Sequence, residues 1–193
     1  MNTIDDLIVG LTNLVEDMED GLASRSSLEI GESLVQASLA DMSWLPQRYR
    51  QPEKDAACQY MLYSDPKNRF VITSAVFWPG FVVPVHDHGV WGLIGLYAGS
   101  EHEERYIRVD DRSDPNYAQL QTLDTQENQT GDVSLLLPPD DEIHNIRTTS
   151  SEPSCSLHIY GGNLTNVTRR RFDLETGRVH TFTAPTPREG QLA

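Results

Sequence analysis

Two histidines separated by a single residue are the first candidates for chemistry. His86 and His88 flank Asp87 directly after the apolar run 81–85. In an extended chain, residues i and i+2 point to the same side, so both imidazoles should project together and Asp87 away from them. Two neutral imidazoles on one side suit a divalent metal ion of borderline softness. The pattern fits two solvent-facing or hydrogen-bonded histidines equally well, so a metal site needs a further ligand.

A third histidine follows a turn-rich stretch later in the chain. Gly131 and Asp132 open the apolar run 133–137, and two prolines then lead to His144. In these two stretches the chain resembles the cupin superfamily, whose motifs are H-x-H with a later Gly and a Gly followed by P-x-G-x-x-H. The matching residues are His86, His88 and Gly99, then Gly131, Pro139 and His144, with Asp141 at the second glycine position. The resemblance implies that His86, His88 and His144 surround one metal ion inside a barrel.

One departure from the cupin pattern concerns the fourth ligand. Most cupins have a Glu three or four residues after the second His, where this chain has Gly92 and Leu93. Three neutral histidines leave three open positions on an octahedral iron and favour an anionic ligand such as a thiolate. Asp87, Glu142 and His102 are alternative ligands, although Asp87 should lie on the opposite strand face and Glu142 should point into solvent.

Polar and apolar residues alternate near residue 160. Ser156, His158 and Tyr160 should share one strand face, with Leu157 and Ile159 on the other. The polar face is either the wet face of an ordinary strand or a hydrogen-bonded relay inside the barrel, with the Tyr160 hydroxyl directed at the metal. His158 can accept from one hydroxyl and donate to another, which would fix its tautomer.

Residues 60–171 resemble the thiol dioxygenases of the cysteine dioxygenase family, and most of all their bacterial 3-mercaptopropionate dioxygenase branch. Three stretches carry the resemblance: 65–70 (DPKNRF), 84–95 (PVHDHGVWGLIG), and 156–161 (SLHIYG) with the arginines 169–171. The resemblance implies Fe(II) held by the three motif histidines, with Ser156, His158 and Tyr160 as a relay beside it.

The branch assignment depends on two positions. Gly92 occupies the place where mammalian-type enzymes have a Cys that crosslinks to the active-site Tyr, so Tyr160 should remain a free phenol; Cys155 lies on the opposite strand face. In the mercaptopropionate branch an Arg about nine residues beyond the Tyr binds the substrate carboxylate, and Arg169 stands there, or Arg170 if the count shifts by one. A guanidinium can make two parallel bonds to a carboxylate. The alternative is that the three arginines form a solvated edge.

The reaction that this resemblance implies adds both atoms of O2 to a small thiol and yields the sulfinate. The partners would be a thiol and O2. The sequence does not choose firmly among 3-mercaptopropionate, cysteine, cysteamine and mercaptosuccinate, and ligand type alone would also admit Mn, Co, Ni or Zn. Cysteine dioxygenase and a non-catalytic, metal-dependent small-molecule-binding cupin remain the alternatives.

The elements that must position these residues form one domain. The chain has 193 residues, enough for one core. Apolar spacing predicts a helix from Ile4 to about Gly21 and a second from a capping box at Ser26 and Glu29, with Ile30, Leu34 and Val35 directed inward. The predicted strands cover 58–63, 70–78, 90–97, 102–109, 133–137, 154–160, 168–174 and 179–182. The stretch 110–129 is expected to be a surface excursion, with room for one short hairpin in it. We expect a mainly β cupin jelly-roll barrel (51–185) under an N-terminal helical cap (1–50), with a tail at 186–193.

Composition excludes several classes of function. With 15 Lys+Arg against 29 Asp+Glu, the formal net charge is −14, which argues against nucleic acid as a partner. No apolar run is long enough to span a membrane, and acids rather than Lys or Arg follow Met1, so we expect neither membrane insertion nor export. Cys58 and Cys155 are too few for a disulfide scaffold, which favours reduced thiols in a cytoplasmic protein.

Overall fold

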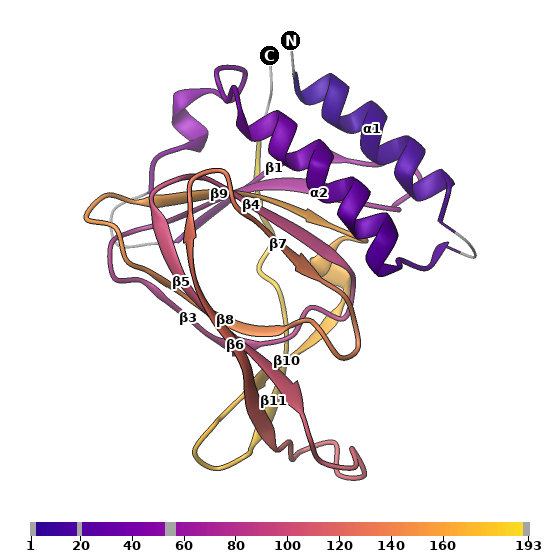
Figure 1. Ribbon diagram of the computed structural model, residues 1–193, viewed down its shortest axis with the longest axis vertical. Coiled ribbons are helices and arrows are strands. Elements are labelled where there is room, and N and C mark those ends of the chain that lie inside the picture. The colour runs from indigo at the N-terminus through magenta and orange to yellow at the C-terminus, as the bar shows by residue number, and fades with distance from the viewer. Residues whose placement is uncertain (1–2, 19–20, 53–56, 191–193) are drawn as a thin grey trace.

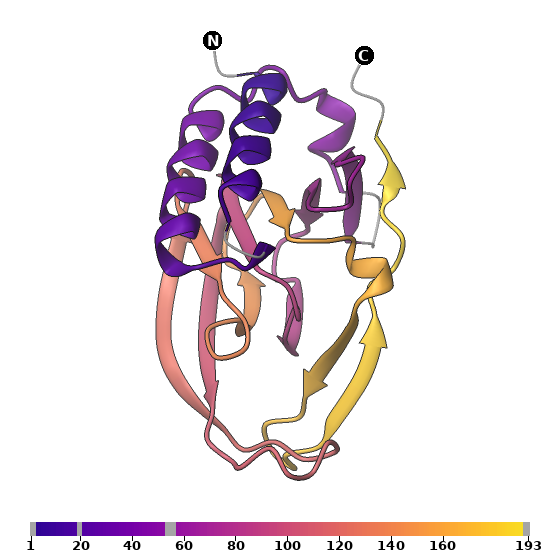
Figure 2. The ribbon, with the colours of Figure 1, turned by 90° about the vertical axis from the view of Figure 1, so that its right-hand side faces the viewer.

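The computed structural model describes residues 3–18, 21–52 and 57–190 and consists of two β-sheets with two helices packed on one of them (Figures 1 and 2). The helices are α1 (Ile4–Glu16) and α2 (Arg25–Leu39), with short 3-10 turns η2 (Gln47–Tyr49) and η3 (Leu164–Asn166). The strands are β1 (Cys58–Ser64), β2 (Val71–Phe77), β3 (Val82–His86), β4 (Gly92–Ala98), β5 (Ser100–Arg108), β6 (Leu120–Gln129), β7 (Val133–Leu136), β8 (Ile143–Thr148), β9 (Ser154–Tyr160), β10 (Thr168–Phe172), β11 (Val179–Thr183) and β12 (Arg188–Glu189).

The strand order is that of a jelly roll. One sheet runs β12-β1-β2-β9-β4-β7 and the other β11-β10-β3-β8-β5-β6. The eight strands β2 to β9 therefore form the sheets 2-9-4-7 and 3-8-5-6, the two four-stranded halves of a jelly roll, and the remaining strands extend them. The expected architecture, a mainly β jelly-roll barrel with an N-terminal helical cap, is confirmed.

The two helices cover the outer face of the first sheet (Figure 1), where α2 packs on β4 and β7. Leucines of both helices form the main core with outward-facing residues of β2, β4 and β9. The close approach depends on glycines, because a Cβ on Gly31 would lie 2.6 Å from Leu93 Cδ1 and one on Gly95 would lie 2.6 Å from Val35 Cγ1.

The start of α2 differs from the prediction. Its capping box is formed by Ser24 and Ser27, not by Ser26 and Glu29. The first helical residue is consequently Arg25, and Leu28 occupies the buried stripe while Ile30 is 59% exposed. The inward position predicted for Ile30 was wrong, because the apolar stripe of the helix passes through Leu28 and Val35 instead.

Strands β3, β6 and β8 were missing from the predicted set. The surface excursion expected at 110–129 was wrong in its second half, where β6 pairs with β5 along the sheet edge. Most side chains of β6 are exposed, so its ten residues show no apolar alternation. Within the stretch expected as a tail, β12 pairs in parallel with β1. No helix in the described part of the chain is long and apolar enough to cross a membrane.

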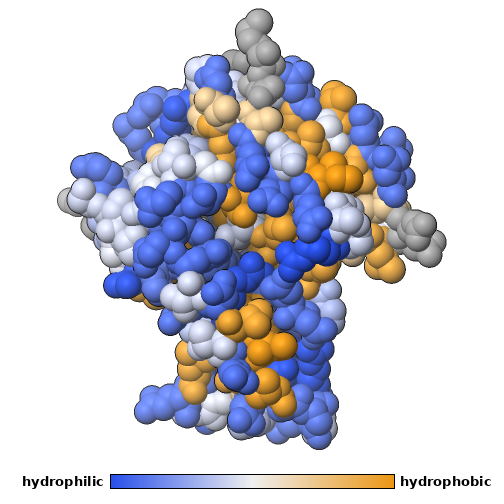
Figure 3. Space-filling view, in the orientation of Figure 1, coloured by the Kyte–Doolittle hydropathy of each residue, from blue (hydrophilic) through white to orange (hydrophobic). Residues whose placement is uncertain are grey.

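Below the barrel the β5–β6 and β10–β11 hairpins extend as a smaller lobe (Figure 1) with its own small core around Tyr106, Ile143 and Phe172. The face shown in Figure 3 is largely hydrophilic, with hydrophobic side chains visible over its upper right and centre and also over this lower part. The barrel above the lobe contains the polar side chains that the sequence singled out.

Candidate metal centre and its cavity

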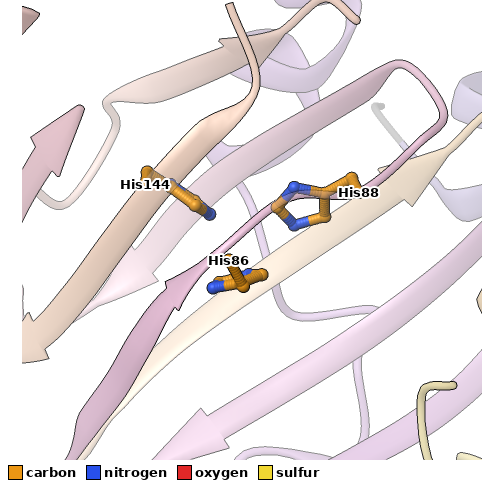
Figure 4. Close-up of side chains that lie close together, drawn as sticks. All are labelled: His86, His88 and His144. Atoms are coloured by element: carbon orange, nitrogen blue, oxygen red, sulfur yellow. The ribbon is translucent and has the colours of Figure 1, made fainter. Parts of the chain in front are cut away.

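The three motif histidines meet inside the barrel. His86 ends β3 and lies opposite His144 of β8 in the strand register, and His88 follows two residues later. All three side chains are buried, and one nitrogen of each lies within 4.8 Å of the others. Figure 4 shows the three rings directed toward a common point. The predicted convergence of His86 and His88 is confirmed. The side chain of Asp87 lies outside the cluster and bonds to Arg170.

Each imidazole is oriented by an oxygen acceptor behind it. Nδ1 of His86 lies 2.8 Å from the Pro84 carbonyl, Nδ1 of His88 lies 3.3 Å from the Glu142 carbonyl, and Nδ1 of His144 lies 2.6 Å from Glu103 Oε1. A carbonyl or carboxylate oxygen can only accept, so Nδ1 carries the proton in each ring. The Nε2 lone pairs are thereby left for a ligand at the centre, the arrangement that metal-binding histidines have.

The surroundings of His86 and His88 keep these two imidazoles neutral. Burial, reinforced by the positive charge of neighbouring histidines and of Arg169, holds the pKa values of His86 and His88 well below the ordinary value. Neutral imidazoles are the form that binds metal. Three buried imidazoles on one side of a cavity fit a divalent ion such as Fe, Mn, Co, Ni or Zn, with coordination positions left open on the cavity side.

Glu103 is the residue of this centre that the sequence analysis missed. It lies on β5 with no exposed surface, and its Oε1 holds His144. Its Oε2 accepts from three further side chains, Gln126 Nε2, Asn128 Nδ2 and Ser134 Oγ, at 2.6 to 2.9 Å. Burial would raise the pKa of Glu103, but the hydrogen bonds and charge of His144 and the other donors hold it below the ordinary value. Glu103 is therefore an ionised carboxylate behind a ligand histidine.

The structure also settles the three alternative ligands. Glu142 does not point into solvent as expected; it is 2% exposed, and its Oε2 accepts from the backbone N–H groups of His88 at 2.9 Å and Gly89 at 2.6 Å. It thus holds the loop that carries His88. Asp87 bonds to Arg170 on the far side of the strand, and His102 pairs with Glu127 away from the cluster.

The polar residues of β9 form a continuous hydrogen-bonded chain. Ser156 Oγ lies 2.8 Å from His158 Nε2, and His158 Nδ1 lies 2.7 Å from the Tyr160 hydroxyl. Both faces of β9 are buried, so the polar face lines the barrel interior and is not a wet face. Burial, with repulsion from His144 and Arg169, lowers the pKa of His158 to about 3, and burial raises the pKa of Tyr160 to about 12. Both groups are neutral near pH 7.

Tyr160 stacks beside the histidines and carries no covalent partner in the described chain. Its ring centroid lies 5.3 Å from that of His88. A Cβ on Gly92 would lie 3.1 Å from the ring, whereas Cys155 is a free thiol under the helices that donates to the Arg50 carbonyl. A side chain at position 92 would therefore lie against the Tyr160 ring. The glycine found there has no side chain that could crosslink to the ring.

A cavity of about 410 Å³ opens from the histidines and contains both Arg169 and Arg171 in its wall. Arg169 is 7% exposed and donates Nε–H to the Asp87 carbonyl at 2.7 Å. No acidic side chain within the described ranges forms an ion pair with it. Arg170 instead pairs with Asp87 and does not line the cavity. Of the two arginines left open by the sequence, only Arg169 faces the centre.

Comparison with known proteins adds little beyond the fold. A scan against protein-family models finds no match. Similar solved structures include an uncharacterised double-stranded β-helix protein from Klebsiella pneumoniae, 12% identical over 69% of this chain and 90% of that one, with a TM-score of 0.43. A cupin superfamily protein from Desulfitobacterium hafniense is 17% identical over 58% of this chain and 84% of that one, with a TM-score of 0.40.

A third similar structure is that of Bacillus subtilis oxalate decarboxylase, determined in a study of its Mn(II) centres. It is 16% identical over 63% of this chain and 29% of that one, with a TM-score of 0.44. Such low similarities say nothing about activity, and the jelly-roll assignment depends on the strand order itself. The chain is a jelly-roll protein with a three-histidine cluster that can hold a metal ion.

Proposed function

We propose that the protein is a non-haem Fe(II) thiol dioxygenase that converts a small thiol carboxylate, 3-mercaptopropionate above all, into its sulfinate. The observation that carries the proposal is the content of one cavity: three convergent histidines, a neutral tyrosine, and an arginine that forms no ion pair with an acidic side chain of the described residues. When bound by the histidines, the iron would supply the redox chemistry that joins O2 to the thiol sulfur.

The reaction balances without a further reductant. The O–O bond and the S–H bond break, both oxygen atoms form bonds to sulfur, and the proton remains with the sulfinic acid or leaves to solvent. Sulfur gives up four electrons and O2 takes up the same four. The protein must therefore position the thiol and manage one proton, and it needs no site for an electron donor.

Arg169 would bind the substrate carboxylate. Its side chain lines the cavity beside His86 and His88, whose pKa values its charge lowers. A guanidinium can hold a carboxylate through two parallel hydrogen bonds. The formal net charge of −14 repels anions at long range, but salt screens this repulsion over about 8 Å. A local cation such as Arg169 can therefore attract the substrate carboxylate at the cavity.

Tyr160 would hold a proton at its hydroxyl oxygen next to the reacting atoms. If Ser156 donates to His158 Nε2, then His158 Nδ1–H donates to the Tyr160 oxygen and leaves the phenol O–H free to donate into the cavity. The low pKa of His158 and the high pKa of Tyr160 keep both groups neutral near pH 7, as this order of donors requires.

The test is O2 uptake by Fe(II)-loaded protein with 3-mercaptopropionate, cysteine, cysteamine and mercaptosuccinate in turn, with the product mass recorded. We expect uptake with a gain of two oxygen atoms, highest for 3-mercaptopropionate. Tyr160→Phe should retain metal and lower kcat on the order of a hundredfold, the size of a general acid–base contribution.

Arg169→Met should raise KM for 3-mercaptopropionate far more than for cysteamine, which lacks a carboxylate, with Arg170→Met as the matched control. No uptake with any of the four thiols at full iron loading would refute the proposal. Unchanged turnover in Tyr160→Phe would refute the role of the relay.

A further inference from the structure

One buried carboxyl group in the cavity has no part in the proposed reaction. Glu101, near the start of β5, is 3% exposed and lines the same cavity as the three histidines. Its Oε1 atom is buried and has no hydrogen-bond partner among the described residues. A buried carboxyl oxygen without a hydrogen-bond donor costs free energy and is rare in folded proteins unless a ligand or water completes it.

The strand register separates the backbone of Glu101 by four residues of β5 from the residue opposite His144. On β5 and β8, Arg105 pairs with His144, whereas Glu101 pairs with Thr148. Four residues along a strand correspond to ~13 Å. Glu101 and Glu103 are buried and alternate with more exposed residues, so both face the barrel interior. The cavity thus contains both the three histidines and a buried carboxyl with one unpaired oxygen.

Much of the wall of this cavity is apolar. Its apolar side chains include Phe77, Phe81, Val83, Ile94 and Ile146, and polar residues such as Gln59 and His158 complete the lining. The cavity volume of about 410 Å³ lies in the range of ~300–1,000 Å³ that buries drug-sized ligands. A three-carbon thiol acid held at the histidines and Arg169 would be too short to reach Glu101, and it would leave the apolar wall uncovered.

The charge state of Glu101 suits a donor group on a ligand. Burial raises the pKa of Glu101 to about 7, with Ser154 opposing the shift and Glu103 adding to it. Near neutral pH the carboxyl can ionise when a cation arrives, and an ammonium–carboxylate hydrogen bond is stronger than a neutral one. In its protonated form the same group can bond to a hydroxyl.

We propose that Glu101 forms a second subsite of the cavity, which binds the hydrogen-bond-donating end group, an amine above all, of an elongated thiol whose sulfur lies at the three histidines. This inference rests on the proposed function, because it assumes a thiol at the metal. It widens the substrate class from three-carbon thiol acids to thiols with an apolar middle and a polar far end.

The test measures binding without turnover. Anaerobic Co(II)-loaded protein is titrated with 6-amino-1-hexanethiol, 6-mercapto-1-hexanol and 1-hexanethiol, and the thiolate-to-cobalt absorption band reports occupancy. We expect the aminothiol to bind at least about tenfold more tightly than 1-hexanethiol, with the alcohol between them, since hydrogen bonds to charged groups are the strongest. In Glu101→Gln the advantage of the aminothiol over 1-hexanethiol should fall to about threefold or less.

Glu29→Gln, an exposed carboxyl on α2, is the matched control and should keep the full preference. If Glu101→Gln does not fold, as judged by thermal melting, Glu101→Met replaces it. Equal wild-type affinity for the amino- and methyl-ended thiols would overturn the proposal, and so would a preference that survives in the Glu101 variant. A single buried water that satisfies Glu101 would produce the first of these outcomes.

The two proposals fail separately. If the amine preference is present and depends on Glu101 but no thiol supports O2 uptake, the subsite stands and the dioxygenase function falls. If 3-mercaptopropionate is oxidised but the aminothiol has no advantage, the function stands and the subsite falls.

Discussion

The carboxylate behind His144 offers a sharp test of how the metal centre is built. Glu103 accepts four hydrogen bonds, one from His144 at Oε1 and three at Oε2. Glu103→Gln has nearly the same shape but only one acceptor oxygen. If that oxygen faces His144, the amide N–H groups meet the three other donors. If the amide nitrogen faces His144 instead, Nδ1 must accept, and the ring proton moves to Nε2, the atom that faces the centre.

Either orientation of the amide weakens metal binding. Loss of an acceptor behind a ligand histidine reduces metal affinity by ~10–100-fold, which is about 1.4–2.7 kcal/mol. Buried donors left without an acceptor cost a further ~1–3 kcal/mol of stability in the apo protein. We therefore expect Glu103→Gln to lower the affinity for Co(II) by about 10–100-fold and to lower the melting temperature of the apo protein.

The assay is competition for Co(II) against a chromophoric chelator, with circular dichroism to verify folding. Glu104→Gln is the control, because Glu104 lies next in the chain on the opposite strand face and bonds to Asn145 and Tyr106. Its Co(II) affinity should stay within about threefold of wild type, below the effect expected for a residue behind a ligand. A folded Glu103→Gln protein with wild-type Co(II) affinity would refute the reasoning.

Two further predictions concern stability. Burial, with repulsion from His144 and Arg169, lowers the pKa of His158 to about 3 in the folded state. Below about pH 6.5 the unfolded state therefore binds a proton at His158 that the folded state does not bind. The free energy of unfolding consequently falls as the pH decreases. In urea unfolding at about pH 5 to 7, His158→Gln should reduce the slope of unfolding free energy against pH by up to ~1.4 kcal/mol per pH unit, and an unchanged slope would contradict the burial argument. Gly95→Ala would place its Cβ 2.6 Å from Val35 Cγ1 under α2 and should destabilise the protein by ~1–3 kcal/mol. The exposed change Ser33→Ala should stay within ~0.5 kcal/mol in the same denaturation experiment.

Local spacing was sufficient for the residues that lie close together in the chain. Strand geometry alone predicted that His86 and His88 project to one side and that Ser156, His158 and Tyr160 share a face, because side chains alternate with a period of two. Helical periodicity likewise located α1 and most of α2. The alternation could not say which face of β9 is wet, and the structure shows that neither is, since the helices cover one face and the opposite sheet covers the other.

Tertiary structure alone decided the supporting shell of the site. Glu142 was expected to point into solvent, and no sequence pattern singled out Glu103. Both are buried in the structure: Glu103 bonds to His144, 41 residues away in the chain, and Glu142 bonds to the backbone of His88, 54 residues away. The same holds for Arg169, which lines the cavity and donates to the carbonyl of Asp87, 82 residues away in the chain. The sequence by itself determined which side chains share a strand or helix face with their near neighbours. The pairing of distant strands decided which of those faces lie in the interior, because burial of a face depends on which other elements pack against it.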